Sequence, residues 1–346
     1  MVPELDRRIP DPKAGSRLNR GRTSSISYPG RMKCPAPYVG RKGNGASGRR
    51  QLRPPPAPAA DPATPRESPS YHRPVELPVA LIQTNAGPDP DANVTRAAEL
   101  TDVAAAAGAR LVALPEYLQY RGPDDGFRAS AREIPGPFTE PFSEIARSHG
   151  CWILVGSLAE TSSDPDRPWN TSTLIGPHGD IVARYRKIHL FDVAVDDGPV
   201  DIESARVMGG NEAVIAEVDG IRLGMSICYD LRFPELYRSL ALGGAEILAV
   251  PSNFTERTGR DHWEVLLRAR AIENGTWIIA PSQIGGPPGH PAYGHSMVIN
   301  PWGIVVAQAP DREAIVYAVI DTDRVAEVRR QIPALANRRP GSYRLG

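Results

Sequence analysis

Apolar and polar residues follow two different periods from residue 74 onward. Short apolar runs bounded by Gly or Pro are typical of buried strands, whereas apolar residues three or four positions apart indicate helices. The short runs predict strands over residues 79–83, 110–114, 151–156, 171–175, 181–185, 221–227, 245–250, 276–280, 294–300, 304–307 and 314–320. The longer period predicts helices over residues 91–107, 141–149, 236–242 and 263–274. Strands that alternate with helices and hairpins indicate an α/β sandwich with mixed sheets.

The first 73 residues lack both periods. They hold 15 Lys and Arg against 5 Asp and Glu, and 13 of the 36 prolines. Such a segment cannot bury enough apolar surface to offset the entropy lost on ordering. We therefore expect a disordered, basic, Pro- and Arg-rich tail over residues 1–73 and one folded domain over residues 74–346. A further hypothesis is that translation begins near Val75.

The composition narrows the class of protein and its compartment. Basic tails can bind nucleic acid or acidic lipid, but a solvated tail explains the composition equally, so we expect no nucleic-acid or membrane partner. No apolar run approaches the roughly 18–20 residues of a membrane span, and no secretory signal is present. Cys34, Cys151 and Cys228 lack zinc-site spacing and are too few for a disulfide framework. These features predict a cytoplasmic protein with free thiols.

Three residues with reactive side chains follow predicted strands. Cys228 lies between an apolar run and a helical pattern, and we expect a partly exposed thiol near helix N–H groups that favour the thiolate. Glu116 follows the strand at 110–114, and Lys187 follows the strand at 181–185. Sites in α/β sheets collect beyond the carboxyl ends of strands, so the three side chains are expected to converge. Taken singly, Cys228 could be a buried small hydrophobe and the other two could be solvated charges.

The sequence around these three residues resembles the signature blocks of the nitrilase superfamily of carbon–nitrogen hydrolases. The resemblance extends from about Val75 to Tyr343, and several ordered blocks are far more specific than one motif. Its blocks are residues 114–116, 186–192 and 227–235, with flanking matches at 199–203, 262–272, 293–296, 300–303 and 338–343.

The resemblance implies an architecture and an assembly. The family has a four-layer αββα sandwich, built on mixed sheets, that forms homodimers or higher homo-oligomers. Residues after about Asp321 are then expected to form a C-terminal extension that reaches toward a partner subunit. No metal or organic cofactor is expected, because the family's side chains supply the chemistry.

The resemblance also implies a mechanism. Cys228 is the expected nucleophile, Glu116 the general base and acid, and Lys187 the oxyanion stabiliser, assisted by the backbone N–H of Tyr229. A thioester would form and then be hydrolysed. Glu203 matches an additional family glutamate and is expected to position Lys187 or the substrate.

The residues after the nucleophile narrow the reaction. True nitrilases usually have Cys-Trp-Glu, whereas this chain has Cys-Tyr-Asp at 228–230. We therefore expect an amidase that converts a small, carboxylate-bearing linear amide to an acid and ammonia. The blocks resemble the branch that acts on deaminated glutathione and on alpha-keto amides. Two alternatives are a hydrolase of N-carbamoyl compounds and a non-catalytic binding module. The presence of all three residues of the triad, Glu116, Lys187 and Cys228, argues against the binding module.

Several other residues receive structural expectations. His189, His262 and His295 are expected to make structural hydrogen bonds. Arg232, four residues after Cys228, is expected to pair with a neighbouring carboxylate. The Gly- and Pro-rich segment 285–291 could line the entrance of the site or be only a surface connection.

Overall fold

The computed structural model describes residues 76–194, 200–287 and 291–343, so the expected tail over residues 1–73 lies outside the described residues. Two six-stranded mixed sheets form the centre of this part of the chain. The first sheet runs in the order β16 (Ala314–Asp321), β1 (Glu76–Gln83), β2 (Leu111–Ala113), β3 (Trp152–Glu160), β4 (Trp169–Ile175) and β5 (Ile181–Arg186). The second runs in the order β15 (Val305–Gln308), β14 (Met297–Ile299), β11 (Trp277–Ala280), β10 (Ile247–Ala249), β9 (Ile221–Met225) and β8 (Ile215–Val218).

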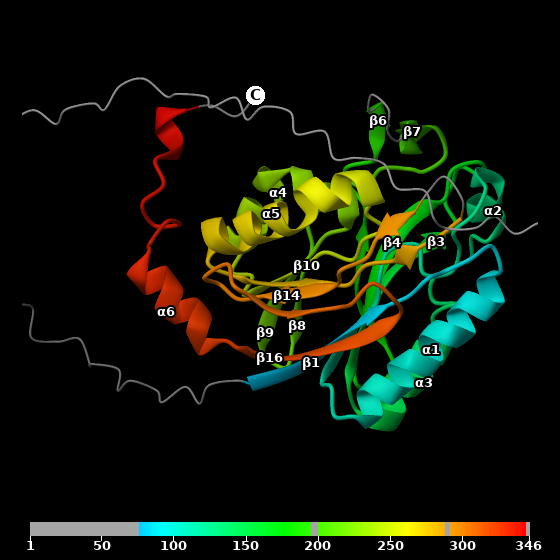
Figure 1. Ribbon diagram of the computed structural model, residues 1–346, viewed down its shortest axis with the longest axis horizontal. Helices are drawn as coiled ribbons and strands as arrows, with labels where there is room; N and C mark the ends of the chain where they lie inside the picture. Colours follow the sequence, from blue (N-terminus) through cyan, green and yellow to red (C-terminus); the bar gives the residue numbers. More distant parts are fainter. Residues whose placement is uncertain (1–75, 195–199, 288–290, 344–346) are drawn as a thin grey trace, which may run out of the picture. The chain divides into compact units, whose positions relative to one another are not determined.

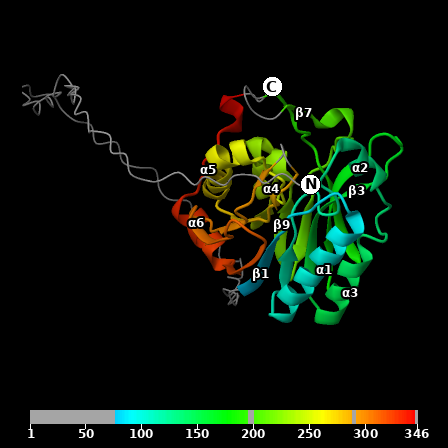
Figure 2. The same cartoon turned by 45° about the vertical axis from the view of Figure 1, so that its right-hand side comes forward.

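Helices cover the outer face of each sheet. Figures 1 and 2 show α1 and α3 along one side and α4 and α5 along the other, with both sheets between them. Within the described ranges, the helices are α1 (Pro90–Ala106), α2 (Asp124–Ala129), α3 (Glu140–His149), α4 (Pro234–Leu242), α5 (Glu256–Asn274) and α6 (Asp323–Gln331). Short 3-10 turns lie at Glu203–Ala205, Cys228–Arg232 and Pro340–Ser342. Two ribbons complete the fold, one of β6 (Asp192–Ala194) with β7 (Val200–Ile202) and one of β12 (Ile284–Gly285) with β13 (Ala292–Tyr293). The expected αββα sandwich with mixed sheets is confirmed.

Alternation along the central strands explains the layers. Leu81 of β1 faces the other sheet and shares one apolar cluster with Leu223 and Met225 of β9. Its neighbour Ile82 points the opposite way and shares a second cluster with Phe142 of α3. Because successive strand side chains point to opposite faces, a strand buried on both faces must be apolar at every position. This is why these strands read as continuous apolar runs in the sequence.

The parallel strands in the two sheets place their following loops at the site. β1, β2 and β3 pair in parallel in the first sheet, and β9, β10 and β11 pair in parallel in the second. Glu116 follows β2, and Cys228 follows β9. Lys187 follows β5, which is antiparallel to β4. Beyond the carboxyl ends of these strands, three separate segments therefore meet.

Some expected boundaries were wrong. The strand expected at 294–300 begins only at Met297, because Gly294 and His295 have φ of 72° and 57°, which is incompatible with extended backbone. α5 begins at Glu256, seven residues before the expected start, because its first turns are polar and carry no apolar period. The elements α2, α6, β6, β7 and β8 were not predicted, since each is short or mostly polar.

The C-terminal helix packs on its own chain. Val325 and Val328 of α6 are buried, and the Arg329 guanidinium donates to the carbonyl oxygens of Ala245 and Asn274 at 2.7 and 3.2 Å. The extension toward a partner subunit and dimerisation both stay predictions. In the described ranges, no helix is long and apolar enough to cross a membrane.

Candidate active site

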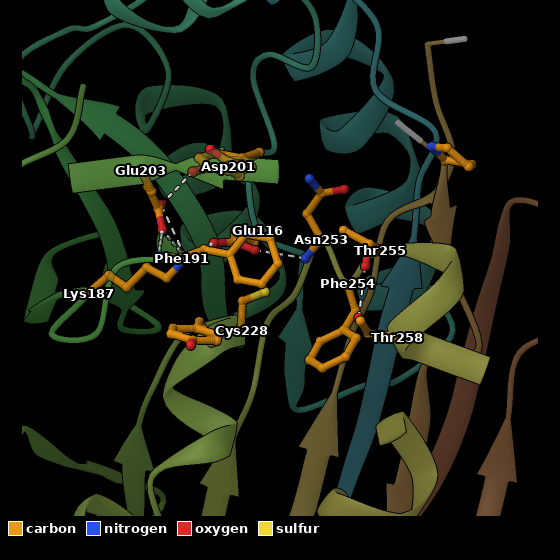
Figure 3. A pocket seen from close by; sticks show the side chains of 13 residues that line it. Glu116, Lys187, Phe191, Asp201, Glu203, Cys228, Asn253, Phe254, Thr255 and Thr258 are labelled. Carbon is orange, nitrogen blue, oxygen red and sulfur yellow. Dashed lines mark hydrogen bonds and ion pairs between the residues drawn. The ribbon is translucent and has the colours of Figure 1, made fainter. Parts of the chain in front are cut away.

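Glu116, Lys187 and Cys228 meet in one buried cluster. Their side chains point toward one another in Figure 3, and 1%, 1% and 7% of their surfaces are exposed. The Lys187 Nζ donates to Glu116 Oε1 at 2.9 Å, and the Glu116 carboxylate is near enough to the Cys228 thiol to raise its pKa. The convergence expected from the strand ends is therefore what the structure contains.

Three donors hold the carboxylate of Glu116. Besides Lys187, the Asn170 side chain donates to Oε1 at 3.0 Å and the Asn253 backbone N–H donates to Oε2 at 2.8 Å. The Gln283 amide also donates to the Glu116 backbone carbonyl at 3.0 Å. A buried carboxylate needs such partners, and here they also fix the orientation of its oxygens.

Lys187 lies between two carboxylates. Its Nζ donates to Glu203 Oε1 at 3.1 Å and to Oε2 at 2.9 Å, in addition to Glu116. These two negative charges hold the pKa of Lys187 well above its ordinary value, although burial acts in the opposite direction. The pKa of Glu203 is lowered despite its burial, because Lys187, Tyr117 and the Phe191 N–H all stabilise the carboxylate. The ammonium group is thus permanently charged and fixed.

Tyr117 and Asn170 belong to this cluster, although the sequence did not single them out. The Tyr117 hydroxyl donates to Glu203 Oε1 at 2.5 Å, and the Asn170 amide lies 3.0 Å from Glu116 and 3.4 Å from Glu203. Burial and the Glu203 charge raise the pKa of Tyr117 well above its ordinary value, so it stays a donor. One signal existed for Asn170: it begins an entirely polar run, Asn-Thr-Ser-Thr, within a strand that must be buried.

Cys228 sits on a strained turn. Its φ is +48°, a left-handed conformation that residues other than Gly rarely adopt. The Asp230 carboxylate stabilises this turn, because it accepts from the Ile227 N–H at 2.8 Å, the Tyr185 hydroxyl at 2.6 Å and the His189 N–H at 3.0 Å. The Cys228 N–H is itself bound to the Pro251 carbonyl at 2.9 Å. These bonds fix the direction of the thiol.

The expected thiolate is not what the structure favours. Cys228 is buried rather than partly exposed, and burial is the largest factor that raises its pKa well above the ordinary value. Glu116 raises the pKa further, and Lys187 opposes this only in part. The nearby Glu116, Glu203 and Lys187 together carry one net negative charge, which disfavours a second anion. These surroundings favour the neutral form of the Cys228 thiol, with the Glu116 carboxylate beside it.

A cavity of about 90 Å³ opens onto the thiol, and we call it the inner cavity. Its wall includes the triad residues together with Tyr229, Glu203, Phe191 and Phe254. Pro291, the last residue of the 285–291 segment, also contributes, whereas residues 288–290 lie outside the described ranges. Across residues 76–194, 200–287 and 291–343, no group of three His, Cys, Asp or Glu side chains could hold a metal ion.

The other singled-out residues surround this cluster. His189 Nδ1 lies 2.7 Å from Asp230, and His295 Nδ1 lies 2.8 Å from the Tyr293 carbonyl, so both histidines make the structural contacts expected of them. The ion pair expected of Arg232 was wrong. Its guanidinium is half-exposed, lies 3.3 Å from His262 Nδ1 and stacks over the rings of Tyr229 and Phe254. In the described chain no carboxylate lies within 4.0 Å of it, because flat aromatic faces occupy the positions beside it.

Comparisons with known proteins agree with this geometry. A family model described as carbon–nitrogen hydrolase matches residues 78–330. Deaminated glutathione amidase of Synechocystis sp. is 41% identical over 75% of this chain and 97% of its own length. Omega-amidase NIT2 of Homo sapiens is 38% identical over 77% and 96%.

Solved structures that resemble this chain also include an amidase. The NitFhit protein of C. elegans has a TM-score of 0.73 and 37% identity, over 78% of this chain and 66% of that chain. An amidase from Nesterenkonia sp. AN1 has a TM-score of 0.65 and 25% identity, over 77% and 95%. A variant of that amidase carries the acetamide moiety of fluoroacetamide, covalently added at its active-site cysteine. The present chain therefore belongs to the carbon–nitrogen hydrolase family and is an amidase of the nitrilase superfamily, acting on carbon–nitrogen bonds other than peptide bonds.

Proposed function

We propose that this amidase uses Cys228 as a nucleophile and hydrolyses a linear amide of a small carboxylate-bearing acid through a thioester. The observation that carries the proposal is the Glu116 carboxylate, which accepts from Lys187 and lines the inner cavity together with Lys187 and the Cys228 thiol. The cysteine adduct in the Nesterenkonia amidase supports the role of the thiol.

Each step of the reaction has a residue to perform it. As the Cys228 sulfur bonds to the amide carbonyl carbon, its proton passes to Glu116 and the carbonyl electron pair moves onto oxygen. Glu116 then gives the proton to the amide nitrogen, the C–N bond breaks, and a thioester remains. Water loses a proton to Glu116 and attacks the thioester, and the proton returns to sulfur as the C–S bond breaks.

Lys187 is the proposed stabiliser of the oxyanion, together with the backbone N–H of Tyr229. Its ammonium group is already fixed by Glu116 and Glu203, so it needs no reorganisation when negative charge develops. A preorganised donor of this kind stabilises a transition state by about 3 kcal/mol. Glu203 acts through Lys187 and is a positioning residue.

A cation near the inner cavity supports the proposed substrate class. Arg232 stacks over Tyr229 and Phe254, both of which line the inner cavity. A guanidinium is suited to bind a carboxylate with two parallel hydrogen bonds. The names of the relatives, deaminated glutathione amidase and omega-amidase, are consistent with a carboxylate-bearing acyl group. A primary amide would release ammonia, whereas deaminated glutathione would release an amine, because its scissile nitrogen carries the rest of the peptide.

The test is a panel of three substrate types with matched cysteine variants. We expect the wild type to release ammonia from alpha-ketoglutaramate or a peptide amine from deaminated glutathione. Cys228→Ala should lower this rate by about 10³-fold or more. Cys151→Ala is the control, because Cys151 is also a buried thiol but belongs to the apolar cluster under α3.

Each result has a distinct meaning. Mass spectrometry of the wild type, quenched during turnover, should find the acyl group on the peptide that contains Cys228. Release of carbon dioxide from N-carbamoyl amino acids, with no amide hydrolysis, would replace the proposal by the ureido alternative. An absence of turnover with every substrate would favour the binding module.

A further inference from the structure

A second and larger cavity adjoins the inner one. Its volume is about 410 Å³, against about 90 Å³ for the inner cavity. We call it the outer chamber and define it by Tyr117, Tyr120, Arg121, Phe127, Asp201 and Arg206 on its wall. Tyr117, Asp201 and Asn253 line both spaces, so the two are contiguous. Ammonia and a single acyl group do not require this additional volume.

The wall of the outer chamber combines aromatic rings with charged side chains. Among its described residues, the charged ones are the guanidiniums of Arg121 and Arg206 and the carboxylate of Asp201. Asp201 forms an ion pair with Arg206 at 2.6 Å. The rings of Tyr117 and Phe127 meet edge to face, with centroids 4.9 Å apart. Apolar walls with a few fixed charged groups are typical of small-molecule sites.

Arg121 is a buried and rigidly held cation. Only 5% of its surface is exposed, and it donates to the Gly285 carbonyl at 2.7 Å and to the Ile284 carbonyl at 3.2 Å. Burial lowers its pKa to about 10, so it remains charged at neutral pH. Gly286 packs directly against it, since a Cβ there would lie 2.1 Å from Arg121 Nη2.

The outer chamber lies beside the proton donor for the leaving group. Tyr117 directly follows Glu116, and the backbone N–H of Asn253 donates to Glu116 Oε2 at 2.8 Å. Both residues border the outer chamber. In the proposed mechanism Glu116 protonates the departing nitrogen. A substituent on that nitrogen would therefore extend toward the outer chamber.

We propose that the outer chamber is a subsite for the leaving group of an N-substituted amide, and that Arg121 on its wall binds a carboxylate of that leaving group. This inference rests on the proposed function. The substrate class is then an amide with an anionic group at each end, one near Arg232 and one in the outer chamber. Peptide-like amides fit this description, whereas primary amides occupy only the inner cavity.

The test uses three substrates with the same acyl group. They are alpha-ketoglutaramate, deaminated glutathione with its terminal carboxylate, and the deaminated glutathione analogue whose terminus is a neutral carboxamide. For each peptide-like substrate, kcat/KM is divided by kcat/KM for alpha-ketoglutaramate. In the wild type, this ratio should be about tenfold or more lower for the carboxamide analogue than for deaminated glutathione itself. Arg121→Gln should lower the same ratio by a similar factor, and capping should then add little.

Two further variants separate binding from folding. Gly286→Ala keeps the charge but displaces the guanidinium, so it should lower the same ratio. Arg128→Gln is the matched control, because Arg128 is an exposed cation paired with Asp166 outside the outer chamber. A merely structural role for Arg121 would reduce turnover of all three substrates equally.

The outcomes distinguish this inference from the proposed function. If the wild type hydrolyses alpha-ketoglutaramate but capping the carboxylate has no effect on the ratio, the subsite is refuted and the amidase mechanism stands. If capping costs as much in Arg121→Gln as in the wild type, a residue other than Arg121 binds the carboxylate. If no amide is hydrolysed at all, the proposed function itself fails.

Discussion

At the scale of single residues, one buried cation organises the candidate site. Lys187 contacts both Glu116 and Glu203 and offsets one of their two negative charges. One net negative charge therefore remains beside the Cys228 thiol, whose neutral form is favoured. Its environment differs from that of a surface lysine, because three carboxylate oxygens replace its water shell. Its contribution to stability and its proposed role at the oxyanion therefore arise from the same contacts.

Lys187→Met should remove both contributions. Two buried carboxylates would lose their shared counter-charge, and we expect a loss of about 3–5 kcal/mol in the free energy of unfolding, measured in urea. Turnover should fall to the level of Cys228→Ala. The comparison is the exposed Arg128–Asp166 pair, whose loss in Arg128→Gln should cost less than about 1 kcal/mol. Equal costs for both variants would contradict this account.

The triad was predictable from the sequence, and its surroundings were not. The order of Glu116, Lys187 and Cys228 and their positions after strands gave the convergence in advance. Asn170, Tyr117 and Asn253 were missed because single polar residues near strand ends are common, and only tertiary contacts select among them. The expectation of a partly exposed Cys228 thiol was wrong, because the local sequence does not show which distant segments cover the turn at Cys228.

At the scale of elements, the loop after β2 depends on a glycine in β3. A Cβ at Gly156 would lie 1.9 Å from the Leu114 carbonyl oxygen and 2.3 Å from that of Pro115. The β3–β4 register shifts in this region, between Val155 and Leu158. A glycine thus lets the backbone that carries Glu116 approach the strand closely.

Gly156→Ala should move Glu116 away from Cys228. We expect it to cost about 1–3 kcal/mol in unfolding free energy and to lower kcat by more than KM changes, since a proton acceptor is displaced. Gly87→Ala is the matched control, because a Cβ at Gly87 has no atom within 4 Å. Unchanged kcat in Gly156→Ala would show that the loop tolerates the shift.

At the scale of the whole molecule, buried charge makes stability depend on pH. The folded pKa of Glu203 is lowered from an ordinary value of 4.5. The contribution of Glu203 to the free energy of unfolding is therefore fully present above its pKa in the unfolded chain. It is lost as the pH falls through its pKa in the folded protein. The pKa of Lys187 is raised from 10.5, so its contribution is present below that value and is lost as the pH rises through the folded value.

Acid unfolding should therefore respond to Glu203. As the pH falls below about 5, the wild-type free energy of unfolding should decrease, and in Glu203→Gln it should decrease less, because the amide does not titrate. The variant should also be less stable at neutral pH, since Lys187 loses one of its two carboxylates. Parallel pH profiles of the two proteins would exclude Glu203 as the titrating group.

The backbone turn at Cys228 has a consequence for protein engineering. Cys228 holds a left-handed backbone conformation that costs a residue with a Cβ about 1–2 kcal/mol. Glycine would adopt it freely, so Cys228→Gly should unfold at a higher temperature than Cys228→Ala. A laboratory selection that rewards heat resistance alone would therefore accept glycine at position 228. With the proposed nucleophile removed, such a variant is expected to be inactive, so the selection needs a simultaneous requirement for turnover.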